Sequence, residues 1–401
     1  MDKGDAHSMR LVHLSDIHLG FRQYQRQTPA GINQREADVA ISLRHVIDKV
    51  IELKPDLVLI AGDVFHAVRP SNPAILHAFH QFSRLMQMLP DATVVMVAGN
   101  HDTPRTAETG CILRLFSPLG ITVVEGEAKR IMFHEHDLSI LAVPDMGKTP
   151  SLEPDPNAKY NILLLHGEIE GVLPRSGREL DRRPMGITPQ ELGADRWDYV
   201  ALGHYHVYRQ VEPNAYYSGS IDFTSTNSWG EKAEEDAAKK GGKGIIEHDI
   251  STGAHTFHPI PPLRQWIDLP SLSGAGLSPA SLDEAIRTTV DNVDGGIDGK
   301  VVRLVVRDVP RHILRELDHK AIREYKRKAL EFYLDTRRPE MVRQGQAAPG
   351  RRASLADTVR DKLRSRLLTE NIDRETLVAL GLHYLQEADR VAGPAEEDAI
   401  A

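Results

Sequence analysis

The chain has 401 residues, 41% hydrophobic and 26% charged, which is typical of a globular protein of two or three domains. Its net charge of -8 argues against binding nucleic acid through bulk positive charge, although local basic patches stay possible. A single cysteine, Cys111, excludes an intramolecular disulfide framework and is typical of a reducing cytoplasm. No apolar run approaches ~18 residues, so we expect no membrane span. The polar residues 1–8 are expected to be a leader or tag remnant.

Short apolar runs alternate with helical patterns from Met9 to about Pro262. The apolar runs end in small or polar residues, as strands buried on both faces do, and lie at 10–16, 56–63, 93–100, 138–144, 161–167 and 198–204. Amphipathic helices are predicted at 37–51 and 72–89, and a further helix pattern lies near 106–116. Strands separated by such helices predict a layered α/β domain over residues 9–262.

The pattern changes after residue 262. Strands at 265–269, 300–306 and 331–338, with helices at 281–290 and 312–330, predict a small α+β domain over 263–342. A linker at 343–353 precedes two helices in 354–390, and a disordered tail is expected at 391–401. The charged stretch 231–244 is predicted to be an exposed loop. Each C-terminal helix carries an apolar stripe, and the two stripes are Leu355, Val359, Leu363 and Leu367, and Leu377, Leu380 and Tyr384.

Metal-ligand side chains follow five of the predicted strands. They are Asp16, His18, Asp63, Asn100, His166, His204 and His206. One such residue is commonly only part of a turn, but strand ends in an open α/β sheet meet at one edge, so we expect all of them to converge. Seven donors are too many for one ion and fit two ions with a bridging carboxylate. The mixed nitrogen and oxygen donors favour Mn, Fe or Zn over Mg or Ca, and two such ions suit in-line phosphoryl displacement.

The order D-x-H, GD-x-x-H, GNHD, H and GH-x-H resembles the calcineurin-like metallophosphoesterases. The resemblance implies a layered β-sandwich flanked by helices, with a small α+β cap domain and C-terminal helices. It also implies two metal positions, one held by Asp16, His18, Asp63 and His206, and the other by the bridging Asp63 with Asn100, His166 and His204. His101 matches the family's catalytic histidine, which protonates the leaving oxygen, and Asp102 is expected to orient it.

Further segments resemble the SbcD-type nucleases, the prokaryotic branch of the meiotic-recombination-eleven nucleases. They are HLSDIHLGFRQYQ, QREAD, IAGDVFH, VAGNHD, DYVALGHYH and YYSGSIDFTS, within residues 10–230, whereas the loops 25–34 and 231–244 depart from the expected pattern. His66 falls where those nucleases contact the scissile phosphate. The resemblance implies an Mn-dependent exonuclease and endonuclease that acts on DNA ends in double-strand-break repair. It further implies a cytoplasmic, nucleoid-associated homodimer that works with an SMC-like ATPase of the SbcC type.

Several alternatives stay open at this point. Residues 300–338 hold 12 Lys and Arg against six Asp and Glu, which indicates either a solvated face or a contact with the DNA backbone. The C-terminal stripes suit either packing on the main domain or a partner, and helix 73–89 suits either a twofold dimer or burial within one subunit. The same core could also serve a small-molecule or nucleotide phosphodiesterase. A DNA-end-binding scaffold with little activity is the non-enzymatic alternative.

Overall fold

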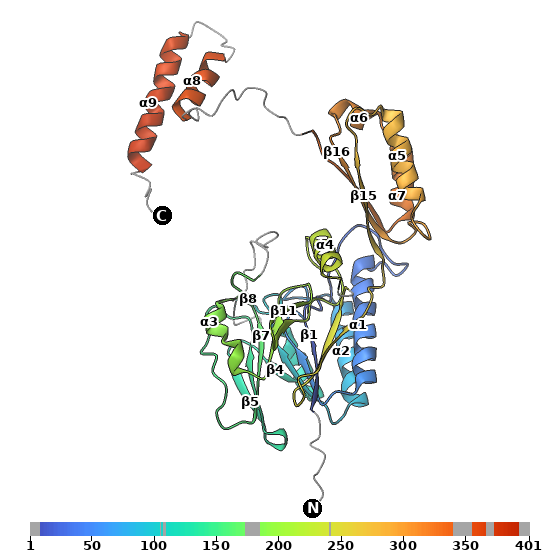
Figure 1. Cartoon of the computed structure of the whole chain (residues 1–401), viewed down its shortest axis with the longest axis vertical. Coiled ribbons are helices and arrows are strands. Elements are labelled where there is room, and N and C mark those ends of the chain that lie inside the picture. The colour runs from blue at the N-terminus through green and yellow to red at the C-terminus, as the bar shows by residue number, and fades with distance from the viewer. Residues whose placement is uncertain are drawn as a thin grey trace, which may run out of the picture. The chain divides into compact units, whose positions relative to one another are not determined.

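The computed structural model describes residues 9–104, 106, 110–172, 185–239, 242–339, 355–365 and 373–392. Contacts divide the chain after Pro339 into two units, 1–339 and 340–401, which we describe separately (Figure 1). Among the described residues, no helix has both the length and the apolar character that crossing a membrane requires.

Unit 1 contains a first six-stranded sheet in the order β14-β13-β1-β2-β3-β4. Its parallel strands are β1 (Arg10–Leu14), β2 (Leu57–Ile60), β3 (Thr93–Val97) and β4 (Thr122–Val124), and β13 (Gly244–Asp249) and β14 (His255–Pro259) complete it in antiparallel pairing. β2 is fully buried, and all but the first residue of β1 and β3 is buried too. The continuous apolar runs in these strands therefore reflect burial on both faces, as predicted.

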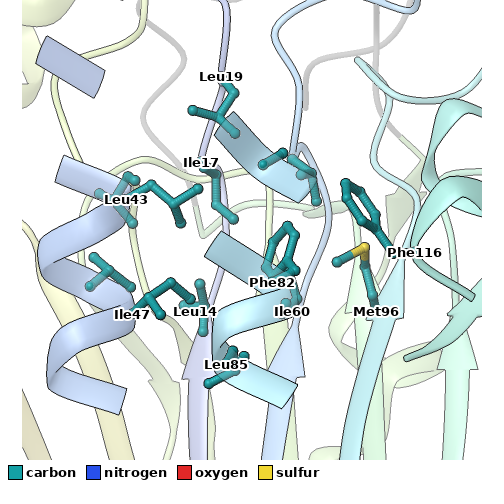
Figure 2. Close-up of a cluster of buried hydrophobic side chains, with 14 of the residues drawn as sticks. Leu14, Ile17, Leu19, Leu43, Ile47, Ile60, Phe82, Leu85, Met96 and Phe116 are labelled. Carbon is teal, nitrogen blue, oxygen red and sulfur yellow. The ribbon is translucent and has the colours of Figure 1, made fainter. Parts of the chain in front are cut away.

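Helices cover the outer face of this sheet. The helices are α1 (Gln34–Leu53), α2 (Asn72–Met88) and the 3-10 helix η2 (Ile112–Leu119), and their apolar side chains meet those of the strands in one cluster (Figure 2). Asn33 caps α1 by accepting from two backbone N–H groups, and the Ser71 side chain caps α2 by accepting from the backbone N–H of Ala74. The helix pattern predicted near 106–116 is thus a 3-10 helix that begins later, at Ile112, within the residues that the structure describes.

A second six-stranded sheet has the order β11-β12-β10-β7-β6-β5. Its strands are β5 (Lys129–Phe133), β6 (Leu138–Val143), β7 (Tyr160–His166), β10 (Tyr199–Gly203), β11 (Arg209–Glu212) and β12 (Ala215–Tyr217). Side chains of both sheets form a shared core, with Leu59 and Val95 from the first and Ile162 and Ala201 from the second. The two sheets therefore make the predicted layered sandwich. Four short elements, β8 (Glu168–Ile169), β9 (Gly186–Ile187), α3 (Pro189–Leu192) and η4 (Ala194–Arg196), follow β7, and η3 (His134–His136) lies between β5 and β6.

A three-stranded parallel sheet follows, made of β15 (Trp266–Ser273), β16 (Val301–Arg307) and β17 (Glu331–Thr336). Its helices are α5 (Pro279–Asp291), α6 (Arg311–Glu316) and α7 (His319–Lys328), and this region has a hydrophobic core of its own. The single helix predicted at 312–330 was wrong. Leu317 adopts an extended backbone, and the side chain of Asp318 accepts from Lys320 N and Ala321 N, so a new helix starts there.

The prediction of an exposed loop over 231–244 was also wrong. Helix α4 (Ser228–Ala238) occupies most of this stretch, and Ser228, Glu231 and Glu235 on it are buried. The charged composition hid the helix because two of its acidic side chains face inward to a buried lysine, Lys243, rather than to solvent.

Unit 2 contains α8 (Leu355–Ser365) and α9 (Arg374–Ala392), which pack on each other. The carboxylate of Asp373 accepts from Thr376 N at 2.9 Å and so caps the second helix. The predicted linker, the start of the first helix at Ser354, its residue Leu367 and the tail from residue 393 onward lie outside the described residues.

Candidate metal centre

The strand ends bring every predicted donor to one place. Asp16 and His18 follow β1, Asp63 follows β2, Asn100 follows β3, and His166, His204 and His206 end or follow β7 and β10. Four of these residues have a left-handed backbone, with φ of 52° at Asp16, 51° at His18, 53° at Asp63 and 107° at His204. Non-glycine residues rarely adopt this conformation, and such strain is concentrated at functional sites.

Asp16, His18 and His206 form the first donor group. One ligand atom of each lies within 4.8 Å of the others. The two imidazole Nε2 atoms are 3.1 Å apart, and His206 Nε2 is 3.9 Å from Asp16 Oδ1. Asp16 is held in place because its carboxylate accepts from the backbone N–H of His204 at 3.1 Å.

Asp63, His166 and His204 form the second donor group, again with ligand atoms within 4.8 Å of one another. Asn100 joins it, since Asn100 Oδ1 is 2.9 Å from His166 Nε2. The side chains of Asp63 and His166 are almost fully buried, whereas His204 is partly exposed. The predicted second ligand set is therefore gathered in space.

Asp63 lies between the two groups. Its Oδ2 is 3.6 Å from His18 Nε2 in the first group and 3.5 Å from His166 Nε2 in the second. Its Oδ1 accepts from the backbone N–H of His101 at 2.8 Å, which fixes the carboxylate plane. A carboxylate in this position can contribute one oxygen to ions on either side.

The donor set fits bound cations. His166 Nδ1 is 2.7 Å from the carbonyl of Ala61, which can only accept, so Nδ1 carries the hydrogen and Nε2 of the neutral ring carries a lone pair. That lone pair faces Asn100 Oδ1, another acceptor. The Nε2 atoms of His18 and His206 also face each other, at 3.1 Å, and a divalent ion could take the place of a hydrogen between such atoms.

The pKa shifts of the four predicted histidine ligands differ in direction. Burial alone would lower the pKa of His166, but the nearby carboxylates, with the charge of Asp63 foremost, together outweigh burial and raise it. Burial would likewise lower the pKa of His206, but nearby carboxylates, with Glu231 foremost, together outweigh burial there and raise it too.

Burial and the neighbouring imidazoles lower the pKa of His18 well below its usual value, and burial and His166 lower the pKa of His204 to about 3. Both rings are therefore neutral, the form that binds metals. Burial raises the pKa of Asp16, because a dehydrated carboxylate needs positive charge beside it.

His66 and His101 lie together on the rim of the first donor group. Their rings stack with centroids 5.2 Å apart, and the His101 ring centroid is 4.8 Å from that of His18. His101 Nδ1 donates to the backbone carbonyl of His66 at 2.8 Å. This hydrogen bond places a hydrogen on His101 Nδ1.

Asp102 makes hydrogen bonds to the backbone of two loops. Its buried carboxylate accepts from the backbone N–H groups of Val64, Phe65 and Gly99, at 3.0–3.1 Å. Asp102 therefore ties the loop after β3 to the loop after β2, and the ring of His101 is held by the His66 carbonyl. Burial, followed by the charge of Asp63, raises the pKa of Asp102 to about 7.

Two glycines of the motifs are needed because neighbouring atoms lie too close to leave room for a side chain. A Cβ on Gly203 would lie 1.7 Å from the Ala61 carbonyl oxygen, and one on Gly99 would lie 2.1 Å from Asp63 Oδ1. Of the three motif glycines 62, 99 and 203, only Gly62 has a left-handed backbone. The second sheet can approach β2 this closely only without a side chain at residue 203.

Buried ion pairs explain two of the sequence segments that carried no chemistry. Arg35 of QREAD is fully buried and donates to Asp222 of SGSIDF at 2.6 Å. Asp38 pairs with Arg35 and also with Arg264, which precedes β15. These segments therefore lock α1 to the chain that follows β12. Sequence reasoning missed Glu231 and Lys243 entirely, and only their charge in a mixed stretch could have signalled them.

Residues 9–213, about half of the chain, match the family model of the calcineurin-like phosphoesterases. The matched range contains all ten predicted site residues, and the chain belongs to this family.

The chain is 30% identical over 260 residues to the DNA double-strand break repair protein Mre11 of Methanococcus maripaludis, covering 61% of this chain and 63% of that protein. It is 24% identical over 326 residues to the Mre11 of Sulfurisphaera tokodaii, covering 76% of each. The crystal structure of TT1561 of Thermus thermophilus is 9% identical, with a TM-score of 0.33, over 63% of this chain and 100% of that chain, which is too distant for an argument.

Proposed function

We propose that the chain is an Mn-dependent DNA nuclease that hydrolyses phosphodiester bonds at DNA ends during double-strand-break repair. The observation that carries the proposal is Asp63, a buried carboxylate 3.6 and 3.5 Å from imidazoles of two separate donor groups. Similarity to Mre11 proteins supports DNA as the substrate. The chain spans 63% of the length of the Mre11 from Methanococcus maripaludis, so the remainder of that protein has no counterpart in the match.

The two donor groups would each hold one divalent cation. Asp16, His18, Asp63 and His206 would hold the first, and Asp63, Asn100, His166 and His204 the second. Imidazole combined with carboxylate and amide oxygen suits Mn better than the all-oxygen sites that Mg prefers. When bound, two such cations orient the attacking water and neutralise charge on the phosphoryl oxygens.

His101 and His66 would act on the substrate from the partly exposed rim. With Nδ1 bonded to the His66 carbonyl, a protonated His101 would donate a proton from Nε2 to the leaving oxygen. His66 lies beside it and would contact the scissile phosphate. Asp102 would keep both loops in register through its three backbone hydrogen bonds.

The basic surface of α7 supports a polyanionic substrate. Lys320, Arg323, Lys326, Arg327 and Lys328 lie on it, and Arg327 pairs with Glu324. Loop 25–34 reaches this helix, since Arg26 donates to the carbonyls of Lys326 and Ala329 at its end. Such a surface would bind the DNA backbone without reading sequence.

Partners follow from exposed apolar side chains. In α9, Leu380 and Tyr384 are exposed, and we propose that unit 2 binds an SMC-like ATPase of the SbcC type. In α2, Leu76 and Met88 are exposed, and we propose that two copies of the chain form a twofold homodimer through this helix. We also propose that the protein is cytoplasmic and associated with the nucleoid. A monomeric mass at micromolar concentration, measured by light scattering, would contradict the dimer.

The proposed activity is tested by incubating the purified chain and Mn²⁺ with linear duplex DNA and, in parallel, with cyclic nucleotides. Cleavage of DNA at a rate that His101→Ala abolishes and His136→Ala preserves is the expected result, since His136 is an exposed histidine of η3. Hydrolysis confined to cyclic nucleotides would establish the small-molecule phosphodiesterase instead. Binding of DNA ends without cleavage at saturating Mn²⁺ would establish the scaffold.

A further inference from the structure

A buried ion-pair network between two glutamates of α4 and Lys243, which precedes β13, contacts the first donor group. Lys243, whose side chain is 1% exposed, contacts Glu231 Oε2 at 2.8 Å and Glu235 Oε1 at 2.9 Å. The two glutamates are four residues apart on one helix and therefore share a face. A lysine buried this deeply is stable only because both carboxylates surround it.

The second oxygen of Glu231 contacts a predicted metal ligand. Glu231 Oε1 is 3.1 Å from His206 Nδ1, and an ionised carboxylate can only accept. His206 Nδ1 therefore carries the hydrogen. In the neutral ring, Nε2 is then the atom with the lone pair, and Nε2 is the atom that lies 3.1 Å from His18 Nε2.

Lys243 holds the same ligand through its backbone. Its ammonium donates to the carbonyl of His206 at 2.9 Å and to Ser220 Oγ at 2.9 Å. Glu231 thus fixes the ring of His206, and Lys243, which pairs with Glu231, fixes its backbone. The second donor group is built differently, because His166 Nδ1 donates to the neutral carbonyl of Ala61.

We propose that Glu231, itself held by Lys243, is a positioning residue that sets the tautomer and orientation of His206 and so the cation affinity of the first donor group. The inference rests on the two-cation site of the proposed function. Carboxylates that accept from a ligating histidine raise its basicity, and their loss costs about 10–100-fold in metal affinity. The effect of Glu231 is expected at one of the two cation positions only.

The test is calorimetric titration of the purified full chain with Mn²⁺, without DNA. Glu231→Gln should weaken one binding step about 10–100-fold and leave the other unchanged. His206→Ala identifies the step, which must be the same one. Asp236→Asn is the matched control, because it removes one carboxylate from the same helix at a side chain that is 61% exposed and pairs with Lys232. Its Mn²⁺ affinities should match those of the wild type.

Unchanged Mn²⁺ affinities in Glu231→Gln would overturn the proposal, and so would equal losses in Glu231→Gln and Asp236→Asn. If Glu231→Gln does not fold, as judged by circular dichroism, Glu231→Asp keeps the charge beside Lys243 but withdraws it from the imidazole, and should weaken the same step. A wild type that binds fewer than two ions overturns the site itself and this inference with it. A wild type that binds two ions but does not cleave DNA contradicts only the proposed nuclease activity.

Discussion

The candidate metal centre and the C-terminal helix pair differ in how far their candidate functional side chains are exposed. At the centre, Asp16, Asp63 and His166 are at most 1% exposed and each is held by neighbours from other segments. In unit 2, Leu355 is 65% exposed, Leu380 48% and Tyr384 62%. A site for small ions needs converging, preorganised donors, whereas a surface for another chain needs apolar side chains left uncovered.

This difference determines how each region should respond to change. Substitutions at the candidate metal centre should remove ions or proton transfer and so act directly on the proposed chemistry. Changes in unit 2 should leave the chemistry intact and remove only an association. The following predictions test that separation, beginning with the largest expected effect.

Replacement of Asp63 by Ala should empty both cation positions and abolish cleavage, because its carboxylate lies 3.6 and 3.5 Å from imidazoles of the two groups. Metal content after dialysis, measured by mass spectrometry, checks this expectation. His206→Ala is the comparison, and should weaken mainly one position. Two ions still bound by Asp63→Ala would rule out the bridging role.

Replacement of His101 by Ala should keep both ions and lower kcat by about 10²–10⁴-fold, the usual contribution of a general acid. The ions should stay because His101 is not one of the predicted ligands, and its backbone N–H, which donates to Asp63, is kept in the variant. Single-turnover cleavage of DNA and a parallel metal analysis make the measurement. A wild-type rate would show that the proton comes from another group.

Deletion of residues 350–401 should leave Mn-dependent cleavage of single-stranded or frayed DNA roughly unchanged, because the chain divides into units after Pro339. It should abolish ATP-stimulated processing of duplex ends and co-purification with the ATPase. Leu380→Glu with Tyr384→Glu should reproduce this result, since both side chains are exposed on α9. Loss of basal cleavage in either variant would instead show that these helices support the catalytic unit.

His13 should make stability sensitive to acid. It lies between the two sheets, where Nε2 donates to the Leu202 carbonyl and Nδ1 accepts from Tyr199 Oη, each at 3.1 Å, and burial lowers its pKa to about 3. As the pH falls below about 6.5, the unfolded chain takes up a proton that the folded chain does not. The free energy of unfolding should therefore decrease by about 2 kcal/mol between pH 7.5 and pH 5 because of this residue alone.

Urea unfolding at the two pH values, compared between wild type and His13→Gln, isolates this contribution. Between the two pH values, the free energy of unfolding should decrease by about 2 kcal/mol less in the variant than in the wild type. Glutamine can donate to the same carbonyl and does not titrate. Equal losses in both proteins would show that His13 is not the buried titrating group. The result would also distinguish His13, a structural histidine, from the histidines predicted to bind metal. The sequence pattern alone does not make this distinction.

The sequence by itself predicted six of the twelve sandwich strands and placed the candidate donors at the ends of five of them. Apolar runs that end in Asp16, Asp63 and Asn100 predict buried strands with ligands at one edge, and β1, β2 and β3 end just before these residues. Local composition suffices there because burial on both faces of a strand leaves a continuous apolar signature.

Only the tertiary structure decided the supporting contacts. Glu231 lies 25 residues from His206 in a charged stretch, and its role depends on a buried lysine that composition makes look exposed. Asp102 and the His66 carbonyl likewise act through backbone groups, which no residue type encodes. Side chains reveal their own chemistry in the sequence, whereas partners distant in the chain meet only once the two sheets have packed.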